Sequence, residues 1–309
     1  MGLARLQLIA GLIVLFGLSV AGIYAAMDPA EIVRKSQNAD KYVSYRGLKY
    51  ADITIDKKTV RAHFKIVHRK PDHTRTEYFQ PAELAGIISI DKGSDSWRYL
   101  PAQQKWQHNK WELAPQRIDL ALKNYNAVSA GKEKICGRSA YVIKLIPKKK
   151  GNPSETIWVD DKYFLVLKSE LRNSSGTPVS VSAFREISFE PTDIKDSAFA
   201  VPVNVKPPNN PVPDLGFKVV KPKYIPKGYS FVQTTTVPVT KDVYAAHLMY
   251  TNGINTISIF ERKRDKNSDK WDDRGNMANV VRFDHGQVTF TIIGDISKAE
   301  LQKIANSLK

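Results

Sequence analysis

Apolar and polar residues alternate along much of the chain, most clearly over residues 137–176. Three alternating runs follow one another there, separated by polar turn clusters. In the third run Leu165 and Leu167 share one parity, and charged residues occupy the other. A period of two indicates a strand with one buried face and one solvated face. The stretch therefore predicts an antiparallel meander.

Alternation in the upstream region predicts more strands and very few helices. The strands are expected within residues 45–50, 62–67, 74–79, 87–90 and 97–100. Short helices are expected over residues 30–42 and 119–125. An antiparallel sheet of this size must curl to cover its apolar face. We predict a mostly β first domain, an antiparallel half-barrel with helices plugging its concave side.

Residues 201–213 read VPVNVKPPNNPVP, and five of them are proline. Such a segment suits neither the centre of a sheet nor a helix interior, so it predicts an extended linker. It would separate a first domain over residues 28–200 from a second over residues 214–309. In the second part, alternating runs surround the Asn252-Gly253 turn, and a capping box at Ser297 opens a final helix. This predicts a smaller α+β domain.

The N-terminal segment predicts export. Arg5 precedes an apolar run over residues 8–27 that contains no charge. This layout is typical of a signal peptide or an N-terminal membrane anchor over residues 1–27. Both alternatives place the remainder of the chain outside the cytoplasm.

The chain is basic: it has 47 lysines and arginines against 31 aspartates and glutamates, a net charge of +16. Export makes nucleic acid an unsuitable partner. Anionic lipid head groups or an acidic protein segment fit the sign of the charge better.

No pattern in the sequence predicts catalysis, a cofactor or a metal site. His63, His68 and His73 are spaced by five, so neighbours would point to opposite faces of a strand, and surface or turn positions are expected. The Asp160-Asp161 pair is expected to be a solvated turn. The single cysteine, Cys136, is expected to be a small buried side chain. We predict that the protein is not an enzyme.

Two groups of residues are candidate binding sites. The first is an apolar ligand cavity inside the half-barrel, although ordinary core and rim packing explains the same residues. Its candidate residues are Trp97, Tyr99, Trp158, Leu165 and Leu167. The second group lies near the Asn252-Gly253 hairpin, where the returning strand ends in a basic run that could also be a solvated loop. Its candidate partner-binding residues are His247, Tyr250, Arg262, Lys263 and Arg264.

The amino-acid sequences of these segments resemble those of a known family. The stretch GRSAYVIKLIPK followed by WVDDKYFLVLKSELRNSSG resembles the first domain of the MucB/RseB family of periplasmic sigma-factor regulators. The second-domain stretches HLMYTNG, SIFE and VTFTIIGDI resemble that family's second domain, in the same order.

The resemblance implies a function that composition and periodicity do not. It implies a first domain with the fold of lipoprotein carriers and a periplasmic location. It implies that the second domain binds the exported segment of a membrane anti-sigma factor and shields it from proteolysis. A lipid-like signal, such as an anionic lipid or lipopolysaccharide, would release that segment. The alternative is a periplasmic lipid or lipoprotein carrier.

Overall fold

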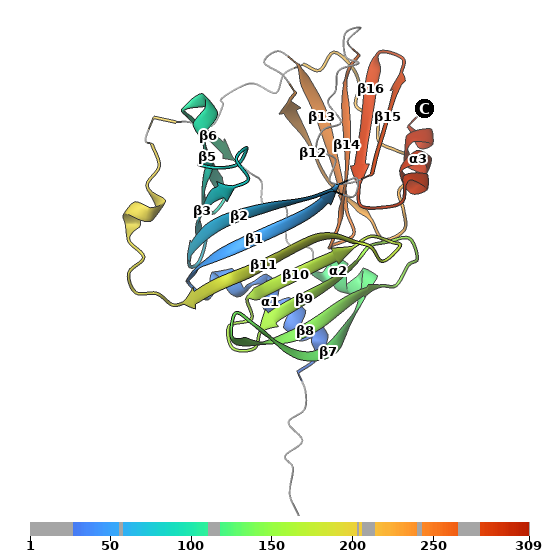
Figure 1. The fold of residues 1–309 in the computed structure, drawn as a ribbon. Coiled ribbons are helices and arrows are strands. Elements are labelled where there is room, and N and C mark those ends of the chain that lie inside the picture. Colours follow the sequence, from blue (N-terminus) through green and yellow to red (C-terminus); the bar gives the residue numbers. More distant parts are fainter. Residues whose placement is uncertain are drawn as a thin grey trace, which may run out of the picture.

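The computed structural model describes residues 27–55, 58–110, 118–202, 204–205, 214–239, 243–264 and 279–308. Within these residues the chain forms two open antiparallel sheets and three α-helices (Figure 1). The prediction of a mostly β protein is therefore confirmed. No helix in the described ranges is both long and apolar enough to cross a membrane. All but the last residue of the apolar run over residues 8–27 and most of the proline-rich segment lie outside those ranges. So do Trp111 and the adjacent carboxylates Asp272 and Asp273, for which the sequence predicts a solvated turn.

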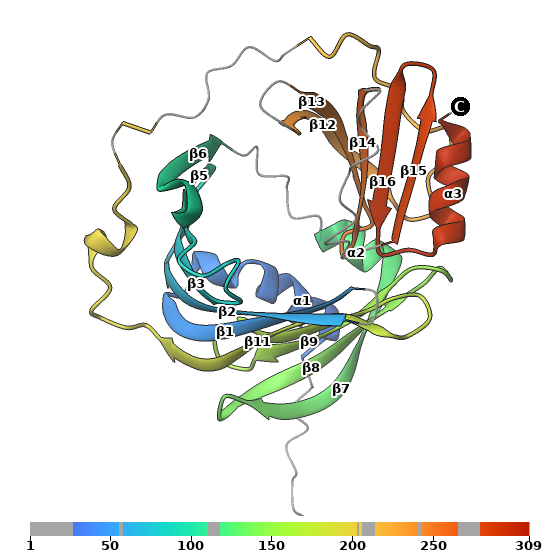
Figure 2. The ribbon, with the colours of Figure 1, turned by 45° about the horizontal axis from the view of Figure 1, so that its top comes forward.

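The first sheet has eleven strands in the order β6-β5-β4-β3-β2-β1-β11-β10-β9-β8-β7. They are β1 (Tyr45–Ile55), β2 (Lys58–Arg69), β3 (His73–Gln80), β4 (Ile88–Lys92), β5 (Asp95–Leu100), β6 (Lys105–Lys110), β7 (Tyr125–Ile135), β8 (Arg138–Pro147), β9 (Ser154–Asp160), β10 (Val166–Arg172) and β11 (Pro178–Phe189). Two meanders share this sheet because β1 pairs with β11. The sheet curls strongly, and β6 and β7 are its two edges (Figure 2).

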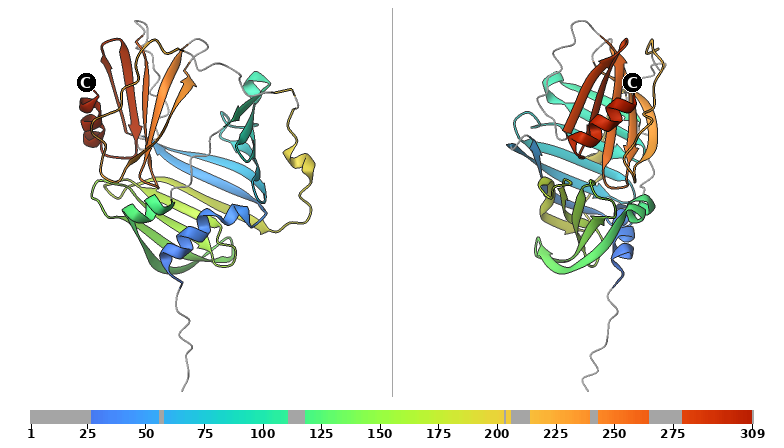
Figure 3. Two further views of the ribbon diagram at one scale, coloured as in Figure 1. Left: turned by 180° about the vertical axis from the view of Figure 1, so that it is seen from behind. Right: turned by 90° about the vertical axis from the view of Figure 1, so that its right-hand side faces the viewer.

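Two helices lie on the side toward which the sheet curls. Helix α1 (Pro29–Gln37) crosses the sheet, and α2 (Ile118–Asn124) lies beside the start of β7 (Figure 3). Asp28 caps α1, its carboxylate accepting the amide of Ala30 at 3.1 Å, and Pro29 occupies the first turn. The apolar side of α1 packs on β7, β8 and β9 in what we call the α1 cluster. Its buried members are Ile32, Val33, Tyr125, Ile143, Leu145, Ile157 and Val159.

The second sheet has five strands in the order β12-β13-β14-β16-β15. They are β12 (Ser230–Pro238), β13 (Tyr244–Thr251), β14 (Thr256–Lys263), β15 (Asn279–His285) and β16 (Val288–Gly294). Helix α3 (Lys298–Ser307) covers one face of this sheet (Figure 1). The hydroxyl of Ser297 accepts the amide of Glu300 at 3.3 Å, so the predicted capping position is confirmed. Leu248, Ile259 and Ile292 are fully buried on this face, together with Leu301 and Ile304 of the helix.

Some elements differ from the sequence predictions. Strands β6 and β7 were not predicted, and β7 is an edge strand with mostly exposed residues, so apolar alternation is weak there. Helix α1 ends at Gln37, and a short 3₁₀-helix over Ala39–Lys41 follows it where a longer α-helix was expected.

The expectation of solvated or surface positions is wrong for Asp160 and two histidines. Asp160 is 0% exposed because Arg138 and two backbone amides of the β9–β10 turn enclose its carboxylate. His68 is buried with both ring nitrogens in hydrogen bonds, to Thr74 Oγ1 and to the carbonyl of Asp40, each at 2.8 Å. His63 is also buried. A spacing rule cannot see these partners, because the fold brings Arg138 to Asp160 and the carbonyl of Asp40 to His68.

The tip of the β13–β14 hairpin reaches the first part of the chain. Gly253 has φ +97°, and a Cβ placed on it would lie 2.3 Å from the backbone nitrogen of Ala121 in α2. The next residue, Ile254, packs against the α1 cluster. The Asn252-Gly253 turn therefore joins the two sheets through α2.

Candidate functional site

The second sheet has one face that no described helix covers, which we call the helix-free face (Figure 1). His247 on β13 lies opposite Phe260 on β14, and their rings stack at 4.3 Å with an interplanar angle of 12°. The Nε2 atom of His247 lies 2.9 Å from the hydroxyl of Ser258. Desolvation lowers the pKa of His247, which favours the neutral ring. The pair is therefore a flat, uncharged and half-buried aromatic unit beside Met249.

The predicted partner-binding residues do not form one surface. Tyr250 belongs to the opposite, buried face and packs in the core under α3. Arg262 shares the parity of Phe260 and is buried. Lys263 and Arg264 are exposed where β14 ends. The structure brings His247 and Arg262 to the helix-free face and separates them from Tyr250.

Lys263 and Arg264 line a cavity of about 370 Å³ at the end of the second sheet. Its other walls are Asp214, Leu215, Gly216, Val243 and Tyr244. Arg264 already has two partners within the fold. Its side chain pairs with Asp284 at 3.0 Å, and its backbone amide donates to the carbonyl of Gln287 at 2.7 Å. The basic run is thus partly a structural anchor.

A second candidate site is a groove of about 620 Å³ between α1 and the β9–β10 turn, which we call the α1 groove. It is lined by Glu31, Arg34, Lys35, Asn38, Ala39, Tyr42, Val43, Lys162, Tyr163 and Phe164. Three of these side chains are cations and one is an anion, and the rest include three aromatic rings. The ammonium of Lys35 lies 4.8 Å from the ring centroid of Phe164. Cations beside aromatic rings suit an anionic group with an attached apolar part.

One wall of the α1 groove is fixed by the buried carboxylate of Asp160. Its oxygens accept the amides of Lys162 at 3.1 Å and Tyr163 at 2.8 Å, and the guanidinium of Arg138 at 2.5 and 3.1 Å. The next residue, Phe164, has φ +58°. The hydrogen bonds of Asp160 therefore hold the β9–β10 turn in one conformation, and the side chains of that turn face the α1 groove.

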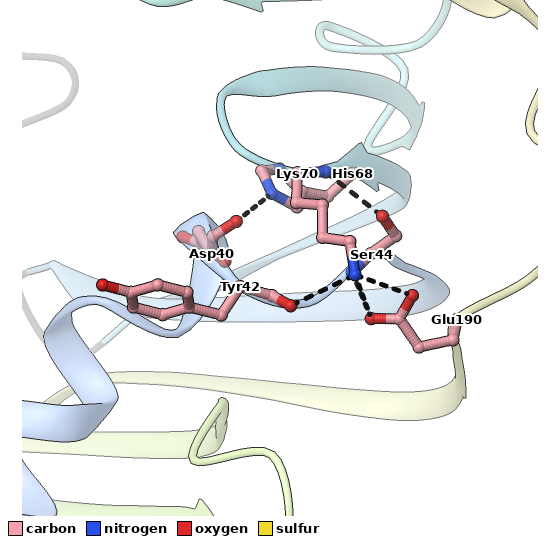
Figure 4. Close-up of polar contacts among 6 residues, drawn as sticks. All are labelled: Asp40, Tyr42, Ser44, His68, Lys70 and Glu190. Carbon is pink, nitrogen blue, oxygen red and sulfur yellow. Dashed lines mark hydrogen bonds and ion pairs between the residues drawn. The ribbon is translucent and has the colours of Figure 1, made fainter.

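The other end of the α1 groove is held by a polar junction (Figure 4). The ammonium of Lys70 donates to the carbonyl of Tyr42 at 3.4 Å and to both carboxylate oxygens of Glu190 at 3.2 Å. Ser44 links Lys70 to Glu190. Its hydroxyl accepts the amide of Lys70 at 3.2 Å, and its own amide donates to the carboxylate of Glu190 at 3.1 Å. These bonds fix the backbone of Tyr42, while the residue remains 74% exposed and its ring points away from the junction.

The predicted cavity residues fall in two places. Trp158, Leu165 and Leu167 are buried together in one core cluster with Phe184. The indole of Trp158 donates to Glu133 at 2.8 Å. Trp97 and Tyr99 lie on β5, near the other edge of the sheet, where Trp97 stacks on His108 and Tyr99 packs near Trp106. The four cavities described in this structure are lined by other residues.

Sequence reasoning did not single out the residues of the α1 groove. Arg34 and Lys35 are ordinary polar positions of an amphipathic helix, and Lys162 belongs to a turn cluster. Only the folded structure brings these three cations together at the α1 groove. Tyr42, an aromatic residue five positions after the end of α1, was the one available signal.

The described residues contain no group of histidine, cysteine, aspartate and glutamate side chains placed to hold a metal ion. The thiol of Cys136 donates to the carbonyl of Phe184 at 2.9 Å, and burial raises its pKa. A thiol in this state is a poor nucleophile.

Glu261 is a buried carboxylate in the second sheet, 0% exposed, and both its oxygens accept the amide of Val220, at 3.0 and 3.3 Å. Burial raises its pKa to about 7. A raised carboxylate pKa means that Glu261 favours folding at low pH and that this contribution is lost as pH rises through about 7. We expect Glu261→Gln to flatten the pH dependence, shrinking the stability difference between pH 5 and pH 8 by about 2–3 kcal/mol.

Urea unfolding at pH 5 to 8 measures this effect. Glu83→Gln removes an exposed carboxylate and controls for the change in net charge. An unchanged pH slope in Glu261→Gln would contradict the assignment.

Two family models match the chain in succession. One is described as the MucB/RseB N-terminal domain and matches residues 88–203, and the other is the MucB/RseB C-terminal domain and matches residues 216–309. The chain is 24% identical to the sigma-E factor regulatory protein RseB of Salmonella typhimurium over 192 residues, which cover 60% of this chain and 59% of RseB. This match spans less than two thirds of RseB. A protein of Methanocaldococcus jannaschii is 22% identical, and the alignment covers 97% of this chain and 98% of that protein.

Solved structures show the same fold. A chain of the Pseudomonas aeruginosa MucA/MucB complex superimposes with a TM-score of 0.64 at 16% identity, covering 90% of this chain and 96% of that chain. MucB in complex with MucA(peri) gives a TM-score of 0.66 at 16% identity, covering 91% and 98%. The likeness extends over both sheets.

Proposed function

Because the chain belongs to the MucB/RseB family, we propose that it is a non-enzymatic periplasmic regulator that binds the exported segment of a membrane anti-sigma factor. Binding would shield that segment from proteolysis. The observation that carries the proposal is the succession of both family domains along one chain. The similar MucB structures include complexes with MucA, which supports a segment of this kind as the partner.

We place the partner on the helix-free face of the second sheet. The stacked His247 and Phe260 rings offer an uncharged contact area, with an apolar neighbour in Met249. Aromatic side chains of this kind often contribute most of the binding energy in an interface. Strand β12 is an edge strand of the second sheet, separated from β14 by β13. An extended partner segment could pair with it.

The exposed cations at the end of β14 suit an acidic partner. Lys263 and Arg264 line the cavity at the end of the second sheet. Exposed charges of this type accelerate and orient association more than they hold the complex. We expect their removal to slow association and to weaken its salt dependence.

We further propose that the α1 groove receives the lipid-like signal, an anionic lipid or lipopolysaccharide. Arg34, Lys35 and Lys162 would contact the anionic group, and the rings of Tyr42 and Phe164 would contact the apolar part. The alternative function, a lipid or lipoprotein carrier, rests on this same groove and leaves the second domain without a role. The domain boundaries at residues 28–200 and 214–309 belong to the proposal too.

A pull-down with the exported segment of a single-span membrane anti-sigma factor from the same organism tests the proposed function. The full chain should retain the segment and slow its proteolysis. Phe260→Ala should weaken binding at least tenfold, because it removes one ring of the stacked pair. Binding constants from titration calorimetry provide the measurement.

The matched control is Phe79→Ala, which removes an exposed ring from the first sheet. It should bind as the unmodified chain does. If the full chain neither retains the segment nor protects it, the regulator proposal is wrong and the carrier remains. If Phe260→Ala and Phe79→Ala bind equally well, the helix-free face is not the docking surface.

A further inference from the structure

A cavity of about 410 Å³ lies between the first sheet and the segment that follows β11. We call that segment, residues 190–199, the strap, and it runs outside the curl of β1, β2 and β3 (Figure 2). The lining residues from the sheet are Arg46, Lys65, Val67 and Arg75, and those from the strap are Asp193, Ile194, Lys195, Ser197 and Ala198. The cavity is therefore formed by parts of the chain more than a hundred residues apart.

This cavity, which we call the strap cavity, lies on the opposite side of the sheet from the α1 groove. Tyr45 is buried in one core cluster with Ala39 and Val43, which also line the α1 groove. Successive side chains of a strand point to opposite faces, so Arg46 faces away from that cluster. The strap cavity and the α1 groove share no lining residue.

The register of β1, β2 and β3 brings three cations together on this outer face. Arg46 lies opposite Val67, and Val67 lies opposite Arg75, so the two arginines belong to one cross-strand row. Neighbouring strands are about 4.8 Å apart, which places the backbones of the two arginines about 10 Å from each other. Lys65 is two residues from Val67 along β2 and therefore points to the same face.

The strap is anchored over these cations at both ends. Arg46 pairs with Asp193 at 2.7 Å, and Arg75 donates to the carbonyl of Ala198 at 3.2 Å. The ring of Phe199 is buried, and the guanidinium of Arg69 lies 5.0 Å from its centroid. The two anchors hold the intervening part of the strap, including Lys195, against the sheet.

The strap cavity has an excess of positive charge. Its four cations face two carboxylates, Asp193 and Glu77, and each carboxylate is already paired with an arginine. Within the described ranges, the ammonium groups of Lys65 and Lys195 make no hydrogen bond or ion pair. About two positive charges thus remain available to a ligand.

We propose that the strap cavity binds a phosphate monoester, held by the ammonium groups of Lys65 and Lys195 with the hydroxyl of Ser197 as a further donor. A phosphate monoester carries a charge of about −1.5 to −2 at pH 7, which matches the two unpaired cations. A carboxylate would neutralise only one of them. Hydrogen bonds between charged groups are the strong ones, and a bound phosphate would bridge the sheet and the strap. Val67 and Ile194 offer a small apolar wall for the organic part of the ligand.

Titration calorimetry on the full chain tests this inference with inorganic phosphate and glucose 6-phosphate, and with glucose and acetate as ligands that lack the phosphate. Vesicles of phosphatidylcholine with and without phosphatidic acid form a third arm. Phosphate-bearing ligands should bind, and they should slow tryptic cleavage after the exposed Lys195 by tying down the strap. Lys65→Gln and Lys195→Gln should each lower the affinity about tenfold. Both lysines are exposed, so these variants should fold normally.

Lys162→Gln is the matched control, because it makes the same change at an exposed lysine of the α1 groove. It should bind phosphate as the unmodified chain does. A response to phosphatidic acid vesicles alone, weakened by Lys65→Gln, would assign the phosphate to a lipid head group at the same site. The inference is overturned if no phosphate-bearing ligand binds, or if Lys65→Gln and Lys162→Gln bind equally well. None of these measurements involves the anti-sigma segment, so their outcome is independent of the proposed function.

Discussion

Replacing Gly253 with alanine should unseat the β13–β14 hairpin from the first domain. The added Cβ would lie 2.3 Å from the nitrogen and 2.5 Å from the Cα of Ala121, and both atoms belong to backbone that cannot rotate away. Gly253 also has φ +97°, which side-chain-bearing residues rarely adopt. The tip must withdraw, which exposes Ile254 and breaks the Asn124–Asn252 and Asn252–Tyr125 hydrogen bonds. We expect a loss of about 3 kcal/mol or more in unfolding free energy.

Chemical unfolding measures the loss, and small-angle scattering should report a larger radius of gyration as the domains separate. Gly286→Ala is the matched control, since Gly286 has φ +58° in the β15–β16 turn with nothing within 4 Å of its would-be Cβ. Gly286→Ala should lose only about 1 kcal/mol of unfolding free energy, from the backbone strain of an alanine at positive φ. Equal losses in the two variants would mean that the contact with Ala121 does not hold the domains together.

The sequence predicts this hairpin but not its role. Asn252-Gly253 is a strong turn signal between two alternating runs, and β13 and β14 form close to the predicted positions. Turn chemistry is local, so it can be read from neighbouring residues. The insertion against α2 depends on contacts with residues more than a hundred positions away, which no local pattern encodes.

The same distinction explains the site predictions. Alternation identifies the strands that carry His247 and Phe260, and it places Tyr250 on the opposite face from His247. It does not tell which face a helix covers, so residues of both faces were grouped as one partner site. The α1 groove was missed because its cations come from a helix and a turn about 130 residues apart in sequence.

The pair of Arg138 and the buried Asp160 should be the most costly polar interaction to break in the first domain. Asp160 is 0% exposed, and the guanidinium of Arg138 contacts both of its oxygens while lying over the ring of Phe189 at 4.5 Å. Arg138→Ala leaves a buried carboxylate with only two backbone donors, Lys162 and Tyr163. Loss of one partner from a buried ion pair typically costs several kcal/mol, and we expect about 3 kcal/mol in urea unfolding.

The control is Arg46→Ala, which breaks the exposed pair with Asp193 and should cost less than about 1 kcal/mol. Arg138→Lys should fall between the two, because lysine keeps the charge and loses the two-pronged contact. The damage should also reach function, since Asp160 holds the turn that carries Lys162 and Phe164 into the α1 groove. Arg138→Ala should therefore weaken binding of an anionic amphiphile to the α1 groove, with dodecyl phosphate as the probe, even at temperatures where the chain remains folded. Equal stability losses for Arg138→Ala and Arg46→Ala would show that the buried pair does not anchor the groove wall.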